Sequence, residues 1–425
     1  MVLSHMAKRW ISFRFLVAFG LLFSLDAACV RSQALTPAWV ELGENGKEVA
    51  RIVVNGPQDC PAILVNRASR PMLLRPNMPQ GLKPVCEFTI PAGAKSASVN
   101  SRPLQLPKRN PARVIAIGDS GCRILRSQIQ DCNDPAHWPF KQVAASAAAE
   151  KPNLIIHVGD YLYRESPCPE VSSAECGGSP AGDNWDAWNA DFFEPAAQLL
   201  SAAPWVFSRG NHENCERAWR GWFYYLDPRP WDGKCEDYSP PYIVKLGKFQ
   251  IAMLDSSATK ESAVDEAQVD KFAGQLASLH PKNAWLATHY PFWGFYTDRA
   301  SGLPKPLAAT LEEAWEKAAP AGYSLILSGH VHLFEYVSVD NGRPPQLVAG
   351  DGGTQMDVPI EVSMKGTTFR GARISGSRIR GQFGYTLLTR HGKHWHLELK
   401  NQRQKILVSC TVPGSSESCE SAGTD

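Results

Sequence analysis

Short apolar runs recur through the middle of the chain, and a polar motif directly follows each of them. Runs of this length and composition predict buried strands of an α/β sheet. The five runs are Val114–Ile117, Leu154–Val158, Trp205–Phe207, Ala284–Ala287 and Leu325–Leu327. The segments between them predict helices at Phe140–Glu150, Trp185–Leu200, Asp265–Leu279 and Leu307–Ala318. This alternation of strand and helix predicts an α/β (α+β) domain over residues 110–410.

Residues 35–109 show a different pattern, in which short alternating or apolar runs are separated by Gly, Pro and Asn. This pattern predicts a separate N-terminal β domain, joined to the rest by the Pro- and Lys/Arg-rich segment Pro103–Pro111. Near the other end, Tyr385–Thr389, His394–Leu399 and Ile406–Val408 predict strands that close a second sheet. Residues 411–425 are predicted to be a C-terminal tail.

The first 34 residues resemble a secretory signal peptide. Basic residues precede the apolar run Phe15–Leu25, which is short for a membrane span of about 20 residues. Ser32-Gln33-Ala34 predicts cleavage after Ala34, and cleavage after Ala27 or Ala28 also fits. The alternatives to cleavage are a lipid anchor at Cys29 or a retained N-terminal anchor. The mature protein is therefore predicted to be secreted or periplasmic, without a stable membrane span.

Cysteine usage agrees with export. The chain has 11 cysteines, and ten remain if Cys29 leaves with the signal peptide. Pairing each remaining cysteine with its neighbour along the chain would give five short-range disulfides, which are typical of an oxidising compartment. These pairs are Cys60 with Cys86, Cys122 with Cys132, Cys168 with Cys176, Cys215 with Cys235, and Cys410 with Cys419. A thiolate metal site is the alternative, but the chain contains no Cys-x-x-Cys motif.

Charge argues against a nucleic-acid partner. The whole chain carries a formal charge of +2 and residues 1–34 carry +3, so the mature chain carries about −1 and is close to neutral. A chain with this charge balance lacks the net positive charge with which proteins attract the phosphate backbone of nucleic acids. One stretch differs, because residues 364–381 contain five Lys or Arg residues and no acid. It is interpreted either as a solvated loop or as a wall that attracts an anionic substrate.

The polar motifs that follow the five runs contain metal-binding residue types. They are Gly118-Asp119-Ser120-Gly121, Gly159-Asp160-Tyr161-Leu162-Tyr163, Gly210-Asn211-His212-Glu213, Leu286-Ala287-Thr288-His289 and Gly329-His330-Val331-His332. Polar residues at strand ends gather at one edge of a sheet, where α/β proteins place their active sites. Turns, helix caps and packed aromatic residues are the alternative interpretations of each motif alone. Five such motifs in order predict a common site.

The donor types suit two metal ions held about 3.5–4 Å apart. So close a pair needs a bridging anion, and Asp160 is the natural candidate. Asp119 and Tyr163 are hard oxygen donors, whereas a histidine-rich set suits a softer divalent ion such as Zn, Mn or Fe(II). His330 and His332 are two residues apart, so on an extended segment both point the same way and each can serve one metal.

Taken together, these motifs resemble those of the calcineurin-like metallophosphoesterase superfamily, and within it those of purple acid phosphatases. Most of the superfamily opens with Asp-x-His, but Gly121 stands where that histidine would be. The Gly-Asp-x-x-Tyr spacing supplies Tyr163 instead, as it does in purple acid phosphatases. The resemblance spans residues 118–332 and includes every metal position of the family pattern.

The resemblance implies a two-sheet αββα sandwich, preceded here by a small N-terminal β-sandwich-like domain. It implies a ferric site of Asp119, Asp160, Tyr163 and His332, and a divalent site of Asp160, Asn211, His289 and His330. The divalent ion would be Zn, Fe or Mn. His212 matches the histidine that contacts phosphate and protonates the leaving group, with Asn211 as a further substrate contact. The implied function is hydrolysis of small phosphate monoesters by an acid phosphatase-like enzyme.

Three points stay open at the level of sequence. The ligand set does not separate a monoesterase from a phosphodiesterase or phospholipase with two divalent ions. A secreted binding protein that keeps the metal cage without catalysis is a second alternative. Arg164 follows Tyr163 directly and could clamp the substrate phosphate, or it could form an ion pair with Glu165 or another acid.

Overall fold

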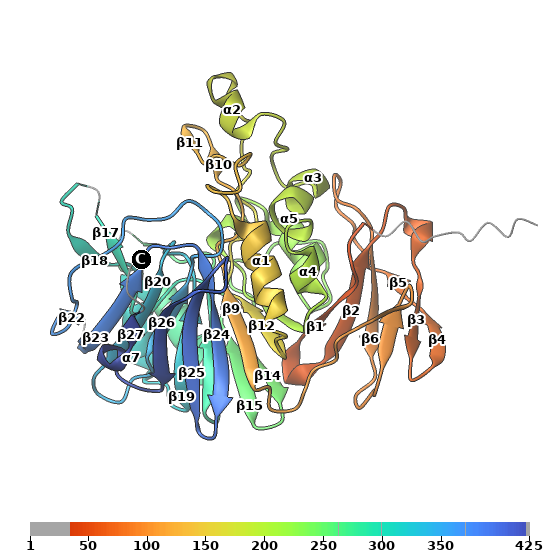
Figure 1. The fold of residues 1–425 in the computed structure, drawn as a ribbon. Helices are drawn as coiled ribbons and strands as arrows, with labels where there is room; N and C mark the ends of the chain where they lie inside the picture. Colours follow the sequence, from red (N-terminus) through yellow and green to blue (C-terminus); the bar gives the residue numbers. More distant parts are fainter. Residues whose placement is uncertain (1–34, 262, 299, 370, 422–425) are drawn as a thin grey trace, which may run out of the picture. The chain divides into compact units, whose positions relative to one another are not determined.

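The computed structural model of the chain describes residues 35–261, 263–298, 300–369 and 371–421. The predicted signal peptide, residues 1–34, lies outside these ranges. Two large β-sheets dominate the described part, and helices lie beside them (Figure 1). Among the residues described, no helix is both long enough and apolar enough to cross a bilayer.

The first sheet has eleven strands in the described chain, and its centre is parallel. Strands β9, β12, β13 and β1 run side by side in one direction, and antiparallel strands extend the sheet on both flanks. In sheet order the strands are β27 (Glu420–Ser421), β26 (Ile406–Val412), β25 (His394–Asn401), β24 (Gly384–His391), β9 (Arg113–Ile117), β12 (Leu154–His157), β13 (Trp205–Phe207), β1 (Trp39–Leu42), β2 (Glu48–Val53), β6 (Val85–Ile90) and β5 (Leu73–Leu74).

The second sheet has eight strands in the described chain, and it too has a parallel centre, formed by β15, β16, β19 and β21. In sheet order the strands are β14 (Tyr242–Leu246), β15 (Phe249–Met253), β16 (Ala284–Ala287), β19 (Tyr323–Ser328), β21 (Gln346–Ala349), β20 (Phe334–Val339), β23 (Ala372–Arg380) and β22 (Thr368–Phe369). The five predicted strand runs thus occupy the parallel centres of both sheets.

The period of two along each central strand separates an inner from an outer layer. Val114 and Ala116 of β9 belong to the core between the two sheets, together with Leu325 of β19. Ile115 and Ile117 instead pack against the helices over the first sheet. Those helices are α1 (Phe140–Ala149), α3 (Trp185–Trp188) and α4 (Ala197–Leu200), while α6 (Glu266–Ser278) and α7 (Ala309–Ala318) cover the second sheet. The two-sheet αββα sandwich is therefore confirmed.

Three of the four predicted helices form α1, α6 and α7, with ends within two residues of the prediction. The fourth prediction, Trp185–Leu200, is divided into α3, a π-helical turn at Asn189–Phe193, and α4. Pro195 stands between the last two, and a proline interrupts a helix because it has no backbone N–H to donate. The short elements α2 (Ser173–Cys176), α5 (Trp219–Gly221), β10 (Ile124–Leu125), β11 (Gln128–Ile129), β17 (Phe295–Thr297) and β18 (Pro304–Pro306) were not predicted.

The N-terminal strands divide between two sheets. Strands β1, β2, β6 and β5 extend the first sheet, whereas β4 (Ala68–Pro71), β3 (Ala62–Val65), β7 (Ala97–Val99) and β8 (Arg102–Pro103) form a four-stranded sheet. Ile63 and Val99 of the smaller sheet share a core with Ile52 of β2. A small β-sandwich-like unit is present, while its status as a separate domain ending at residue 109 stays a prediction.

At the C-terminal end one topological prediction is wrong. Strands β24, β25 and β26 do not close a second sheet; they add to the first sheet, where β24 pairs antiparallel with β9 and β25 and β26 continue the antiparallel pattern outward. Apolar runs alone predict that a segment is a strand, but they do not say which sheet edge it joins. The predicted tail 411–425 includes the end of β26 and, at Glu420–Ser421, strand β27.

All five disulfides pair neighbouring cysteines, as predicted. The Cys122–Cys132, Cys168–Cys176 and Cys215–Cys235 bonds each begin a few residues after one of the first three polar motifs. The Cys60–Cys86 bond joins the N-terminal strands, and Cys410–Cys419 ties β26 to the segment before β27. The alternative of a thiolate metal site is excluded for these ten residues.

Candidate metal centre

All seven predicted metal ligands lie at the carboxyl ends of central strands. Three motifs follow β9, β12 and β13 of the first sheet, one follows β16 of the second, and the last occupies the turn from β19 to β20. The ends of both sheets therefore contribute to one place, which is a common position for active sites in α/β folds. The residues that meet there are Asp119, Asp160, Tyr163, Asn211, His289, His330 and His332.

One group of donors surrounds the phenol oxygen of Tyr163. That oxygen lies 2.7 Å from Asp160 Oδ2, 3.1 Å from Asp119 Oδ1 and 2.9 Å from His332 Nε2. All four side chains are buried. The four residues assigned to the ferric site by resemblance therefore lie within contact of one another.

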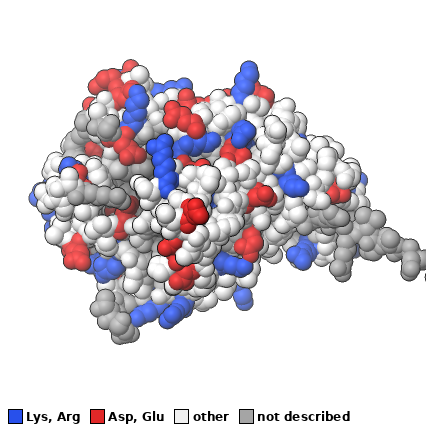
Figure 2. All heavy atoms as spheres, turned by 90° about the horizontal axis from the view of Figure 1, so that it is seen from above, with Lys and Arg blue, Asp and Glu red and all other residues white. Residues whose placement is uncertain are grey.

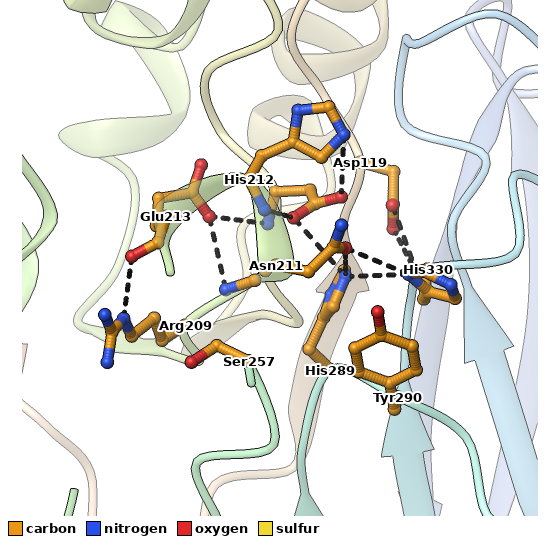
Figure 3. A network of polar contacts seen from close by, with 12 residues as sticks. Asp119, Arg209, Asn211, His212, Glu213, Ser257, His289, Tyr290 and His330 are labelled. Carbon is orange, nitrogen blue, oxygen red and sulfur yellow. Dashed lines mark hydrogen bonds and ion pairs between the residues drawn. The ribbon is translucent and has the colours of Figure 1, made fainter. Parts of the chain in front are cut away.

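A second group lies beside it, and Figure 3 shows its side chains converging. Asn211 Oδ1 is 2.9 Å from His289 Nε2 and 3.0 Å from His330 Nδ1, and the two imidazole nitrogens are 3.3 Å apart. Asp160 Oδ1 is 3.3 Å from His289 Nε2. Asp160 thus turns one carboxylate oxygen toward each group, which is the geometry of a bridging ligand.

The chemistry of this donor set fits a cation. Hydrogen bonding alone would favour turning the Asn211 amide round, so that its nitrogen donated to Asp160, His289 and His330. In the present orientation an oxygen and two ring nitrogens point their lone pairs at a common centre. Such an arrangement is repulsive without a positive charge and favourable around a metal ion. The residues present therefore fit the metal pair that the motifs imply.

Each predicted histidine ligand is oriented by a contact to its other ring nitrogen. His289 Nδ1 is 2.9 Å from Val158 O, and His332 Nδ1 is 2.8 Å from Gln355 O. A carbonyl can only accept, so these bonds place the proton on Nδ1 and leave Nε2 free to bind a metal. His330 is reversed: Nδ1 faces the centre, and Nε2 lies 3.2 Å from Glu261 Oε1.

Burial governs the charges of the isolated side chains. It raises the pKa of the Tyr163 phenol well above its usual value, and the carboxylates of Asp160 and Asp119 raise it further. Burial likewise raises the pKa of Asp119, and the Asp160 carboxylate adds to that effect. Several buried donors cannot all carry a negative charge away from water unless a positive charge lies beside them. A multivalent cation would supply that charge.

The backbone of the ligand loops is held in unusual conformations. Asp119, Asp160 and His330 have positive φ angles of 51°, 60° and 73°. Such angles are uncommon for non-glycine residues, and strain of this kind clusters at functional sites. Two glycines permit the close approach: a Cβ at Gly210 would lie 2.0 Å from Asp160 Oδ1, and one at Gly329 would lie 2.2 Å from Asp119 Oδ2.

Two buried carboxylates outside the predicted set hold the loop that carries Asp160 and Tyr163. Glu213 accepts hydrogen bonds from the backbone N–H groups of Asp160, Tyr161, Leu162 and Gly210, at 2.8–3.2 Å. Asp191 accepts from the backbone N–H groups of Cys122, Tyr163 and Arg164 at 2.7–3.0 Å. Glu213 belongs to a recognised motif, whereas no spacing signal pointed to Asp191.

His212 stands beside the metal centre, with its ring centroid 3.7 Å from that of Tyr163. Its Nδ1 is 2.5 Å from Glu165 Oε1, and its Nε2 is 3.8 Å from Asp160 Oδ2. Arg217 pairs with the same glutamate and contacts the imidazole at about 3 Å. Burial lowers the pKa of His212, and Asp160 and Glu165 oppose that effect.

The structure does not bring Arg164 into this group of side chains. Its Nε is 2.7 Å from Asp191 Oδ1, its Nη1 contacts Ser179, and its guanidinium lies over the ring of Trp138. This corresponds to the alternative interpretation, an ion pair with an acid. The arginine that lies at the site is Arg217, which sequence reasoning missed because it belongs to no recognised motif.

Comparison with known proteins identifies the family of the part of the chain that carries these residues. The family profile described as calcineurin-like phosphoesterase matches residues 112–334, a little over half of the chain. No curated protein matches the chain significantly.

Solved structures share the fold at low identity. Purple acid phosphatase PPD1 from yellow lupin (Lupinus luteus) seeds is 12% identical, with a TM-score of 0.58 over 91% of this chain and 77% of that one. PhoD is 10% identical, with a TM-score of 0.54 over 92% of each chain. At these identities the likeness concerns the fold, and the profile match supplies the family. The chain belongs to the calcineurin-like phosphoesterase family.

Proposed function

We propose that this protein hydrolyses small phosphate monoesters, in the manner of a purple acid phosphatase. The observation that carries the proposal is the position of the Tyr163 phenol oxygen, within 3.1 Å of donor atoms of Asp119, Asp160 and His332. A buried phenol placed among carboxylates is unfavourable on its own, but it suits a trivalent cation.

The metal pair would be one Fe(III) and one divalent ion, namely Zn, Fe or Mn. Asp119, Asp160, Tyr163 and His332 would hold the first, and Asp160, Asn211, His289 and His330 the second. Two bound ions at such a spacing supply Lewis-acid stabilisation of phosphate charge and activation of water. Hard oxygen donors dominate the first set and imidazoles the second, which supports a mixed-valence assignment.

The residues beside the metals would bind the phosphate. With the Asn211 oxygen turned to the centre, its amide nitrogen lies 3.0 Å from Arg217 Nη1. Two N–H donors so placed lack a shared acceptor, and a phosphate oxygen near both would provide one. Arg217 thus replaces Arg164 as the arginine we expect to contact substrate.

His212 would supply the proton for the leaving alkoxide or phenoxide oxygen. Glu165 holds Nδ1, whereas Nε2 lies 3.0 Å from Arg217 Nη2 and 3.8 Å from Asp160 Oδ2, so Nε2 is the nitrogen that we expect to face the substrate. A positioned imidazolium of this kind contributes by donating a proton as the ester bond breaks. Because the donor must be protonated, an acidic pH optimum follows.

The working compartment is proposed from the disulfides. Five disulfide bonds in one chain favour an oxidising environment. We therefore propose that the mature protein, after loss of residues 1–34, is secreted or periplasmic. The expected partners are small phosphate esters, with no nucleic-acid partner, because the mature chain is close to electroneutral.

A visible absorption spectrum of the oxidised, purified protein tests the assignment. Tyrosinate bound to Fe(III) should give a broad purple band, which Tyr163→Phe should abolish. Rates on p-nitrophenyl phosphate and bis(p-nitrophenyl) phosphate should favour the monoester at acidic pH. A colourless protein loaded with Zn or Mn that prefers the diester would replace this proposal with a phosphodiesterase. Metal-replete protein without turnover of either compound would leave a non-catalytic binding protein.

A further inference from the structure

A groove of about 910 Å³ opens between β23, the hairpin that joins β25 to β26, and the segment 359–363. Four basic side chains line it: Arg378 and Arg380 of β23, and Arg403 and Lys405 of the hairpin. The acids on its wall are Glu361 and Glu417, and Glu417 is already paired with Lys365 at 2.8 Å. The groove therefore has an excess of positive charge.

The groove opens at the same edge of the sandwich as the metal centre. Arg380 pairs across strands with Phe334, which lies two residues after His332. On the other side, Gly384 pairs with Asn401 at the base of the hairpin. Gly384 begins β24, whose Thr386 pairs with Ala116, near the end of the strand that delivers Asp119. Figure 2 views the molecule from above and shows Lys, Arg, Asp and Glu side chains interspersed over that face.

Residues 355–359 form one continuous segment that connects the proposed metal centre with the groove. Gln355 O accepts from His332 Nδ1, and Asp357 Oδ2 accepts from the His332 backbone N–H. The chain then continues through Pro359, which lines the groove. A molecule bound at the metals could thus extend along this segment into the groove.

Within the described part of the chain, the hydrogen bonds of the Arg378 and Arg380 side chains on β23 all go to neutral groups. Arg378 Nη2 donates to Cys419 O at 3.0 Å, and its buried Nε has no hydrogen-bond acceptor among the residues described. Arg380 donates to Ile379 O at 2.9 Å and to Ser421 Oγ at 2.6 Å. Among the residues that the structure describes, none forms an ion pair with the guanidinium group of Arg378 or Arg380. Burial and the charge of Arg378 both lower the pKa of Arg380, as expected where two cations lie close together.

We propose that this groove binds phosphate groups of a polyphosphorylated substrate that lie outside the ester being hydrolysed. The inference rests on the proposed phosphatase function and narrows its substrate class. Guanidinium groups suit phosphate because their N–H groups form paired, charge-assisted bonds with its oxygens. The groove accounts for the basic stretch at residues 364–381 more fully than a solvated loop does, because two of its arginines face a cavity.

The test compares three ligands in one assay. The substrate is p-nitrophenyl phosphate. One inhibitor is orthophosphate, which should bind at the metal centre alone. The other is linear polyphosphate, which is long enough to occupy both the metal centre and the groove. In the double variant Arg378→Gln/Arg380→Gln, the polyphosphate inhibition constant should rise at least tenfold. The KM for p-nitrophenyl phosphate and the orthophosphate inhibition constant should stay within twofold. Metal content measured after each assay excludes chelation by polyphosphate.

Arg373→Gln is the matched control, because Arg373 lies on the same strand, is exposed and does not line the groove. It should leave all three constants unchanged. The proposal is wrong if the double variant binds polyphosphate as tightly as wild type, or if all three constants rise together. If wild type hydrolyses no p-nitrophenyl phosphate, the proposed function fails separately. Calorimetric titration of linear polyphosphate then decides the groove: tenfold weaker binding by the double variant supports it, and equal binding refutes it.

Discussion

Asp160 is the residue that contacts both halves of the proposed metal centre. Its two carboxylate oxygens face different donor groups, and its backbone N–H is fixed by Glu213. It also accepts from the backbone N–H of His212 at 2.9 Å. One residue thus couples the metal pair to the histidine that we propose as the proton donor, so their relative positions are set locally.

Replacing His212 should affect turnover and leave the metals in place. His212→Ala is expected to lower kcat by about 10²–10⁴, the range for loss of a positioned general acid. Both metal ions should remain bound, because His212 is not among the seven ligands. Steady-state kinetics together with elemental analysis checks this. A variant with the kcat of wild type would remove His212 from the mechanism.

Glu261 is expected to strengthen binding of the divalent ion through His330. Its carboxylate contacts His330 Nε2 at 3.2 Å and accepts from the Tyr290 hydroxyl at 2.7 Å, while the Tyr290 ring lies 3.9 Å from that of His330. A carboxylate behind a ligating imidazole fixes its orientation and raises its basicity. Glu261→Gln should therefore weaken divalent binding by about 10–100-fold.

Chelator competition measures this effect, and the ferric absorption band should be retained. Glu261 is 46% exposed, so its replacement should not disturb the core. Glu266→Gln is the control, because Glu266 is an exposed glutamate of α6 nearby in sequence. Equal divalent affinity in the two variants would show that Glu261 does not act through His330.

At the scale of elements, the proposed site residues lie on loops, and disulfide bonds and hydrogen bonds fix the conformation of these loops. The segment after β13 bears Asn211, His212 and Arg217, and Cys215 anchors it to Cys235. Between β13 and α5 the regular structure is a single helical turn at Asn211–Glu213. Loops with little regular structure open locally at low cost, so such ties are needed to preserve the geometry.

Removing the Cys215–Cys235 bond should therefore reduce both stability and metal retention. The double variant Cys215→Ser/Cys235→Ser is expected to lose about 2–4 kcal/mol of unfolding free energy, and to release the divalent ion more readily. The control is Cys410→Ser/Cys419→Ser, whose disulfide lies at the edge of the first sheet. It should lower stability without loss of metal. Urea unfolding and metal analysis would separate the two outcomes.

How far the sequence predicts this structure differs between elements and contacts. Central strands such as β9 and β12 are continuous apolar runs, so their position and the residues at their ends could be predicted. The partners Glu261 and Asp191 could not, because each acts through a contact distant in sequence and carries no motif. Arg164 shows the limit: its position next to Tyr163 suggested phosphate, but a buried acid 27 residues away pairs with it.

For the whole molecule, the N-terminal strands are integrated with the rest through buried polar contacts. Arg51 of β2 is fully buried, pairs with Glu41, and donates to the carbonyls of Tyr225 and Asp227 at 2.9 and 2.8 Å. Arg75 donates to the Asp227 carbonyl as well. Losing one partner of a buried pair typically costs about 3–5 kcal/mol. These contacts act together with the strand pairing of β1 and β13.

Truncation decides whether residues 35–109 form a domain of their own. A chain that begins at Asn110 would lose β1, β2, β5 and β6 from the first sheet and expose the edge of β13. It would also lose Trp39, Val40 and Leu42, which are buried, each contributing about 1.5–3 kcal/mol. Their sum approaches a typical net stability of about 5–15 kcal/mol. We therefore expect no cooperative unfolding transition by calorimetry and no metal binding. A truncated chain that melts within a few degrees of the full-length protein and keeps both metals would instead establish an independent catalytic domain, with the β1–β13 pairing reduced to a docking contact.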